Sequence, residues 1–313
     1  MREMIFQAHW WLDAVAPNDW DELRIEDAGQ VLARLPFQVR RRWGTTTLTQ
    51  PMLCPRLGPW LADVQARPDR QIAEQHARLT ALIDRLPRFD WFEQHFSTEL
   101  TSWLPFYWRG FTQTTLYTNR FESLANLVDI QRNFRKGLRS DIHRLQHRLT
   151  IEERDDVDEA YRIVQKSYEH HGCAFPIRKA VLERAYLASR QREAGTLLFA
   201  VDEAGAVHAV DFCIWDEHCM HSFMRGRNHP LGHTGAAALL LWHAMQRAAT
   251  QGLAFDFHGS MDEGVSAFLR SFGAQLTPLS RVTKSTGRYR ALNHARTLAR
   301  SVRRSGNSAK GPT

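Results

Sequence analysis

The stretch "QGLAFDFHGSMDEGVSAFLRSFGA", residues 251–274, is a short apolar run followed by a polar turn and a phenylalanine-rich segment. Successive side chains of a strand point to opposite faces of a sheet. If the apolar run is a strand, Phe255 and Phe257 share one face, and Asp256 and His258 share the other. With the phenylalanines packed against a helix, this strand turns its polar pair toward a cleft.

The polar turn carries signals for the start of a helix. Ser260 and Glu263 have the Ser-x-x-Glu spacing of a capping box, and Asp262 adds a negative charge to the first turn. We assign these three residues to structure. The chain has no Gly-x-Ser-x-Gly sequence, so we expect no serine nucleophile on a strand-to-helix elbow. The chemical groups of this corner are therefore Asp256 and His258.

One order of elements occurs twice along the chain: a strand hairpin, a further strand, a Pro/Gly loop, a helix and a final strand. Phe89-Asp90-Trp91 stands in the first set where Phe255-Asp256-Phe257 stands in the second. This repetition predicts an internal duplication of an α+β unit, and two unrelated mixed domains are the alternative. The predicted organisation is a first unit over 1–122, a basic connecting helix over 123–150, a second unit over 151–285, and a basic amphipathic helix with a disordered tail over 286–313.

The charge of the chain is unevenly distributed. Its 313 residues, enough for two domains, carry a net charge of +7. Residues 281–313 contain nine Lys/Arg and no acid, so the other 280 residues sum to 7 − 9 = −2. A body of that charge, without a recognition-helix motif, argues against a DNA-binding regulator. The tail alternates Leu/Ala with Arg at helical spacing, which predicts packing on the body, with lipid or RNA contact as the alternative.

Residues 131–148 have helical spacing and hold six cations against one acid. Arg132, Lys136, Arg139 and His143 follow i, i+4, i+7 and i+11, which places them on one helix face. Such a stripe is either a solvated surface or a docking strip for a polyanion such as RNA or a diphosphate. We take Arg132, Lys136 and Arg139 as the candidate polyanion-binding residues.

The sequence predicts a cytoplasmic protein with no metal site. No stretch approaches the ~20 apolar residues that span a bilayer, and the first residues lack the apolar run of a signal peptide. The four cysteines show no close pairing and fit buried thiols in a reducing compartment. In "EHCMHS", residues 217–222, a strand would turn His218 and His221 to opposite faces, and no second ligand cluster lies nearby in sequence. Peripheral binding at the inner membrane face is left open.

Two stretches carry a family resemblance. Residues 129–144, "DIQRNFRKGLRSDIHR", resemble the Arg/Lys-rich helix between the two units of the Fem aminoacyltransferases, and residues 251–274 resemble the last strand and helix of the GNAT acyltransferase fold. The resemblance implies an α+β fold of two tandem GNAT-like units. It also implies acyl or aminoacyl transfer to an amine-bearing acceptor, in a cell-envelope or peptide-modifying role. The donor, acyl-CoA or aminoacyl-tRNA, would enter as a substrate between two splayed parallel strands, with no tightly bound cofactor.

The loop before the long helix departs from these relatives. GNATs that bind coenzyme A carry Gln/Arg-x-x-Gly-x-Gly/Ala there, whereas this loop reads "RGRNHPLGHTGAA" over residues 225–237. Arginines and helix N-termini nevertheless bind phosphates. The candidate donor-binding residues are Arg225, Arg227, Gly232, His233, Thr234 and Gly235. The alternative is that the glycines only permit a tight turn and close helix packing.

Amide formation needs a group that takes the acceptor's proton and a group that stabilises the oxyanion. We take His258 as the base because the ordinary pKa of histidine is near neutral, with Asp256 orienting it. Relatives carry Tyr or Lys in the last helix where this chain has Leu269, so the next residue, Arg270, is the candidate for the positive charge. The structural alternative makes Asp256 a partner of nearby backbone and His258 a satisfied edge group. The alternative function is a non-catalytic GNAT-like module that binds RNA or anionic lipid through the basic helix and tail.

Overall fold

The computed structural model describes residues 1–231 and 235–294, so most of the predicted basic tail lies outside the described residues. In these two ranges no helix combines the length and the hydropathy needed to cross a bilayer. The chain forms two compact units. Unit 1 comprises Met1–Arg2, Asn18–Thr114 and the chain from Ser280 onward, and unit 2 comprises Glu3–Pro17 and Thr115–Leu279. The boundaries predicted from sequence follow the chain in order, whereas the units take segments from both ends.

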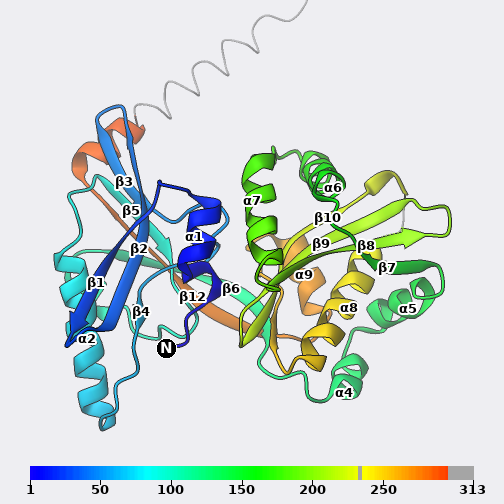
Figure 1. Cartoon of the computed structure of the whole chain (residues 1–313), viewed down its shortest axis with the longest axis horizontal. Coiled ribbons are helices and arrows are strands. Elements are labelled where there is room, and N and C mark those ends of the chain that lie inside the picture. The colour runs from blue at the N-terminus through cyan, green and yellow to red at the C-terminus, as the bar shows by residue number, and fades with distance from the viewer. Residues whose placement is uncertain (232–234, 295–313) are drawn as a thin grey trace, which may run out of the picture. The chain divides into compact units, whose positions relative to one another are not determined.

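Unit 1 is built on a sheet with the strand order β1-β2-β3-β5-β12, with β4 paired to β2. Its neighbouring strands are antiparallel except β3 and β5, which run parallel. Two strands that belong partly to this unit, β6 and β12, also carry the chain to and from unit 2. The elements of unit 1 are β1 (Asp21–Asp27), β2 (Gln30–Arg42), β3 (Thr45–Thr49), β4 (Trp60–Leu61), α2 (Pro68–Asp84), β5 (Trp91–His95), α3 (Leu104–Trp108), and parts of β6 (Thr112–Phe121) and β12 (Gln275–Ser285) (Figure 1).

The hairpin and the helix that the repeated order predicts in the first unit are present, each with a local reason. Ala28 and Gly29 both have positive φ, 47° and 79°, as the tight hairpin between β1 and β2 requires. Helix α2 takes Pro68 in its first turn, where the missing N–H has no partner to lose. Its apolar stripe, which includes Leu79 and Leu82, packs into the core of unit 1. The helix thereby covers the sheet on which it lies.

Unit 2 is built on a sheet with the strand order β6-β11-β10-β9-β8-β7, in which β10 and β11 run parallel. Helices α6 and α7 lie on one face of this sheet and α5 and α8 on the other (Figure 1). The elements are η1 (Ile5–Gln7), α1 (His9–Val15), α4 (Leu127–Arg132), α5 (Lys136–Leu145), β7 (Leu149–Glu153), α6 (Val157–His170), α7 (Lys179–Arg190), β8 (Gly195–Asp202), β9 (Val207–Trp215), β10 (Cys219–Arg227), η2 (His229–Leu231), α8 (Ala236–Thr250), β11 (Ala254–Asp256) and α9 (Glu263–Arg270).

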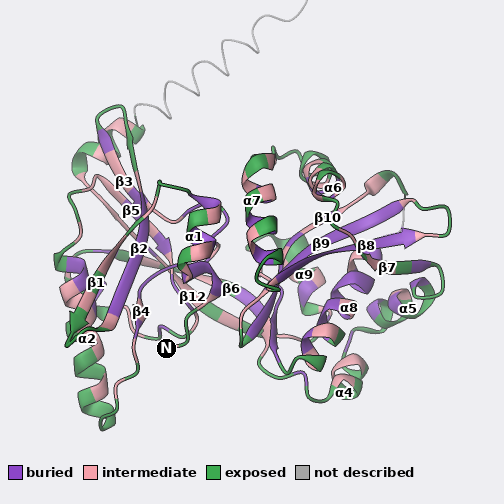
Figure 2. Cartoon of the chain, in the orientation of Figure 1, coloured by how far each residue is buried: buried purple, intermediate pink, exposed green. Residues whose placement is uncertain are grey.

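Burial differs between the edge strand of unit 1 and the central strands of unit 2. Strands β8 and β9 of unit 2 are buried along nearly their whole length, whereas β1 of unit 1 is largely exposed (Figure 2). Helices on both faces explain this, because they exclude water from both sets of alternating side chains. A polar side chain inside the sheet of unit 2 therefore needs a partner or a function.

The N-terminal segment packs into unit 2, although the sequence placed it in the first unit. The backbone N–H of Ile5 donates to Asp216 at 3.1 Å, and Arg184 donates to the carbonyl of Ala14 at 3.0 Å. Phe6 and Trp11 are fully buried. The segment is apolar but carries no signal that names the surface it covers, so only the tertiary structure assigns it.

The predicted single basic helix over 131–148 is wrong. The structure has two helices, α4 and α5, with a break at residues 133–135. At the break Phe134 enters the core beside Trp242 and Phe272, and the N–H of Arg135 donates to the carbonyl of Ser271 at 2.8 Å. In a continuous helix, the N–H of Arg135 would bond to a carbonyl of the same helix. Its bond to Ser271 and the burial of Phe134 therefore explain why the helix is interrupted here.

The strand-level match between Phe89-Asp90-Trp91 and Phe255-Asp256-Phe257 also does not hold. Asp90 comes just before the first residue of β5, whereas Asp256 is the last residue of β11. Both aspartates lie beside a parallel pair of strands, but at opposite ends of it. Each unit nevertheless has its own run of neighbouring strands, so the predicted two-unit architecture is present.

Candidate functional site

A wedge opens between the parallel strands β10 and β11. They pair at three positions, ending with His221 opposite Asp256, while β10 runs on to Arg227 beside β9 alone. A bulge in β10 between Ser222 and Met224 accompanies this separation. Bulges bend a strand and redirect its side chains. The polar groups at the mouth of the wedge therefore come from the point where the two strands part.

A hydrogen-bonded corner fixes the backbone beyond β11. The carboxyl of Asp256 accepts from the hydroxyl of Thr118 at 2.6 Å and from the backbone N–H of His258 at 2.9 Å. The same hydroxyl accepts from the N–H of Gly259 at 3.1 Å. His258 has a φ of 52°, a left-handed conformation that is uncommon outside glycine. Asp256 and Thr118 thus hold a strained backbone that sets the direction of the imidazole.

Three ionisable side chains meet at this corner and form what we call the His–Asp–His cluster: His221, Asp256 and His258. Their nitrogen and oxygen ligand atoms lie within 4.8 Å of one another, and the two imidazole rings are 5.0 Å apart. Phe6 and Phe223 enclose His258, at 5.5 and 5.9 Å between ring centres. Two imidazoles and a carboxylate are ligands that Zn²⁺ accepts, so the cluster could hold a metal ion. Sequence reasoning expected none, because His221 is remote in the chain from the other two.

The predicted alternation of faces is confirmed, but the cap of the following helix lies elsewhere. Phe255 and Phe257 are fully buried in the core of unit 2, on the face away from the cluster. Helix α9 is capped by Asp262, which accepts from the N–H of Val265 at 2.9 Å, and not by Ser260. The Ser260 hydroxyl accepts from the N–H of Asp262 instead. The turn is therefore two residues longer than the capping box predicts.

The position where relatives carry Tyr or Lys belongs to the core in this chain. Leu269 is fully buried with Phe257 and Phe272, while Arg270 is exposed in the last turn of α9. A role for Arg270 stays a prediction from sequence.

Arg225 lies inside the wedge. Its guanidinium donates to the Ser222 hydroxyl at 2.5 Å and, from β10, to the carbonyl of Phe257 at 3.3 Å. Ser222 in turn donates to the fully buried carboxyl of Asp211. Burial raises the pKa of Asp211 to about 6, and the charge of Arg225 opposes that rise. Arg225 therefore forms a hydrogen bond across the gap between β10 and the segment after β11. Its positive charge also favours the ionised form of the buried Asp211.

The remaining donor-binding candidates are spread around the start of α8. Arg227 donates to the Nδ1 of His229 at 2.8 Å, and Gly235 is the N-cap of α8. A Cβ on Gly235 would lie 2.8 Å from Leu145 and 3.0 Å from Asp141, so close helix packing accounts for this glycine. Gly232, His233 and Thr234 lie outside the described residues.

The candidate polyanion-binding residues do not form one helix face. Arg132 is on α4 and pairs with Asp129 at 3.0 Å, whereas Lys136 and Arg139 are on α5. All three candidate side chains are exposed, and Arg139 donates to the carbonyl of Arg132 at 2.5 Å. The break between the helices thus divides the predicted stripe without burying it.

Comparison with known proteins places this site in a defined domain. Residues 132–265 match the sequence model of the acetyltransferase (GNAT) domain, and no curated protein matches the chain. FemX superposes with a TM-score of 0.66 at 11% identity, over 88% of this chain and 91% of that one. The C-terminal domain of a putative lysylphosphatidylglycerol synthetase from Agrobacterium fabrum gives 0.55 at 13% identity, over 94% and 91%. L-PGS from Bacillus licheniformis gives 0.52 at 11% identity, over 94% and 96%.

These findings define the fold: an α+β chain built from two GNAT-like units, of which residues 132–265 match the acetyltransferase (GNAT) domain. The match to the acetyltransferase (GNAT) domain covers residues 132–265, and the likeness to FemX extends the shared fold over both units. That domain contains β10, β11 and α8, the elements around the wedge. The predicted fold class is confirmed.

Sequence reasoning did not connect three residues of this site with Asp256 and His258. His221 lies on a buried strand, and the sequence indicates only that it could face the acceptor from a central strand of the second unit. Thr118 and Phe6 come from distant segments, and neither has a sequence signal that connects it to residues 255–259.

Proposed function

We propose that this chain transfers an acyl or aminoacyl group to an amine and forms an amide, with His258 as the base. The observation that supports this most is the position of His258. It stands where β10 and β11 part in a GNAT domain, and Asp256 and Thr118 hold its backbone there. An imidazole with a near-neutral ordinary pKa suits proton removal from an ammonium or amine.

In the proposed reaction, the acceptor nitrogen attacks the acyl carbonyl carbon of the donor. The C–N bond forms, the bond from the carbonyl carbon to the donor's sulfur or oxygen breaks, and that leaving group takes up a proton. His258 accepts the proton lost by the nitrogen. Asp256 acts as a positioning residue through the backbone N–H of His258.

The donor we propose is acyl-CoA or aminoacyl-tRNA, held as a substrate between β10 and the segment after β11. Arg225 already spans this gap, so a donor would compete with its bond to the carbonyl of Phe257. Arg227 and the N-terminus of α8, a 15-residue helix, are the proposed partners of donor phosphates.

A donor screen tests the proposal. The full chain is incubated with a panel of acyl-CoA thioesters or aminoacyl-tRNAs and a mixed panel of amines, and acylated products are detected by mass spectrometry. His258→Ala should lower turnover by about 10²–10⁴-fold, the usual contribution of a general base. His218→Ala is the matched control, because His218 is exposed and precedes β10 outside the cluster.

Equal turnover in His258→Ala and His218→Ala would remove the base assignment. Thermal stabilisation by coenzyme A without any effect of tRNA would assign the thioester donor. The converse would assign the aminoacyl-tRNA donor.

The second candidate function is polyanion binding without catalysis, through RNA or anionic lipid. The observation in its favour is the exposure of Lys136 and Arg139 on α5. Salt-sensitive binding of tRNA or of anionic vesicles, lost in Lys136→Gln/Arg139→Gln, together with no product from any donor, would favour it.

A further inference from the structure

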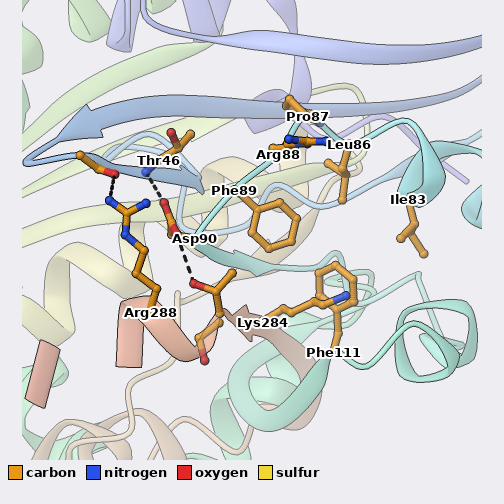
Figure 3. Close-up of a pocket in the computed structure, with 13 residues that line it drawn as sticks. Thr46, Ile83, Leu86, Pro87, Arg88, Phe89, Asp90, Phe111, Lys284 and Arg288 are labelled. Carbon is orange, nitrogen blue, oxygen red and sulfur yellow. Dashed lines mark hydrogen bonds between the residues drawn. The ribbon is translucent and has the colours of Figure 1, made fainter. Parts of the chain in front are cut away.

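Unit 1 contains a pocket of about 600 Å³, formed by its own residues and separate from the groups of unit 2 described above. The pocket lies where β3 and β5 begin, because its lining includes Thr46 in β3 and Asp90 just before β5. Its volume is within the range of sites that bind small molecules. The lining residues are Gly44, Thr46, Ile83, Leu86, Pro87, Arg88, Phe89, Asp90, Phe111, Lys284, Ser285, Thr286 and Arg288 (Figure 3).

One part of the lining is apolar. Phe89 and Phe111 stand 6.1 Å apart between ring centres, and Ile83 and Leu86 come from the end of α2 and the turn after it (Figure 3). Phe111 and Ile83 are also part of the core of unit 1, so these walls are fixed by packing. An alkyl or aromatic group in the pocket would therefore meet a preformed apolar surface.

The other part of the lining is cationic. The pocket is lined by three cations, Arg88, Lys284 and Arg288, and by a single acid, Asp90. Asp90 is already engaged: it accepts from the N–H of Thr46 at 2.9 Å and from the hydroxyl of Thr286 at 3.2 Å (Figure 3). The lining residues thus carry a net charge of +2, and the carboxyl of Asp90 is hydrogen-bonded to a backbone N–H and to a hydroxyl.

The cations keep donors for a ligand. Lys284 donates one of its three N–H bonds to the carbonyl of Arg109 at 2.6 Å, and its ammonium lies 4.8 Å from the centre of the Phe111 ring. Arg288 donates to the carbonyl of Gly44 at 2.9 Å through one of five N–H groups. Arg88 is exposed. Carbonyl partners orient these cations without neutralising them.

We propose that this pocket binds an amphipathic anion: a phosphate or carboxylate group attached to an apolar chain or ring. The anion meets Arg88, Lys284 and Arg288, and the apolar part lies against Phe89 and Phe111. Neither the anionic group nor the apolar group alone is expected to bind tightly, because the cations are partly solvated and the apolar wall is small. The site is independent of amide formation in unit 2, so it stands whether or not the proposed function does.

The test is isothermal titration calorimetry of the full chain with three probes: octyl phosphate, 1-octanol and inorganic phosphate. Octyl phosphate should bind at least about tenfold more tightly than either half, since it combines charged hydrogen bonds with apolar burial. Arg88→Gln and Lys284→Met should each weaken octyl phosphate about tenfold. Arg70→Gln is the matched control, because Arg70 is an exposed arginine near the start of α2, about 20 Å along the helix from Ile83.

Equal binding of octyl phosphate to the wild type and to the Arg88→Gln/Lys284→Met variant would overturn the proposal. So would equal affinities for octyl phosphate and inorganic phosphate. If Lys284→Met does not fold, Arg88→Gln still decides, because Arg88 is exposed and contributes no core packing. Co-sedimentation with phosphatidylglycerol vesicles, lost in Arg88→Gln, would identify the ligand as a membrane lipid. Octyl phosphate binding without co-sedimentation would identify a free amphipathic acid.

Discussion

Thr118→Val tests whether the corner beyond β11 is held together by one hydroxyl. Valine keeps nearly the shape of threonine and removes its oxygen, which contacts both Asp256 and the N–H of Gly259. Both side chains of the first bond are buried, with 2% of Thr118 and 0% of Asp256 exposed. Water therefore cannot replace the lost bonds without opening the corner.

The magnitude follows from the two bonds. A hydrogen bond to a carboxylate contributes about 1.5–3 kcal/mol and a neutral one about 1 kcal/mol, so the free energy of unfolding should fall by about 2–4 kcal/mol. The loss should also loosen the left-handed backbone of His258. Because a displacement of 1 Å near the reacting atoms costs about 10²-fold, kcat should fall by that order with a smaller change in KM.

Urea unfolding measures the first effect, and turnover with the donor found in the screen measures the second. Thr250→Val is the control, since its hydroxyl donates only to the carbonyl of Arg247 at the exposed end of α8. A Thr118→Val protein as stable and as active as Thr250→Val would refute the reasoning. A loss of stability with unchanged kcat would leave the corner structural and deny its part in positioning His258.

Three further predictions concern the same unit. Gly259→Ala should destabilise the protein by about 1–3 kcal/mol in urea unfolding, because the new Cβ would lie 2.5–2.6 Å from β6 backbone, whereas Gly137→Ala, with open space in α5, should stabilise it slightly. The folded-state pKa of Asp211, about 6, exceeds its ordinary 3.8, so its contribution to stability is lost as pH rises through this window. The free energy of unfolding of Asp211→Asn relative to the wild type should therefore increase by about 2 kcal/mol from pH 4 to pH 7. Micromolar Zn²⁺ should inhibit turnover of the wild type by occupying the His–Asp–His cluster, and calorimetric Zn²⁺ binding that persists after the cluster histidines are replaced would contradict this.

The two-unit fold was predictable because its signals are local. The hairpin turn at Gly29, the proline that starts α2 and the apolar run of α8 each act within a few residues. The alternation of Phe255 and Asp256 likewise follows from strand geometry alone. Errors appeared where tertiary contacts override local preference, as at Phe134, whose entry into the core breaks the basic helix.

The site was predictable only in part. Asp256 and His258 lie on one strand and its extension, so their common face could be read from spacing. Thr118 and Phe6 reach them from strands and segments far away in the chain, and no periodicity connects such positions. The burial that turns Asp211 into a group with a pKa of about 6 is also a property of the packed sheet.

The sequence by itself determined the class of elements, their repeated order and the polar pair that follows β11, because these depend on backbone geometry and on the side chains of near neighbours. Only the tertiary structure decided that His221 joins that pair, that Glu3–Pro17 pack into unit 2, and that the pocket of unit 1 unites α2 with the chain beyond Lys284. The physical reason is that burial and proximity are set by packing between segments distant in the chain. The strand-to-helix corner of residues 251–274 supplies two of the three cluster groups, and the packed sheet supplies the third.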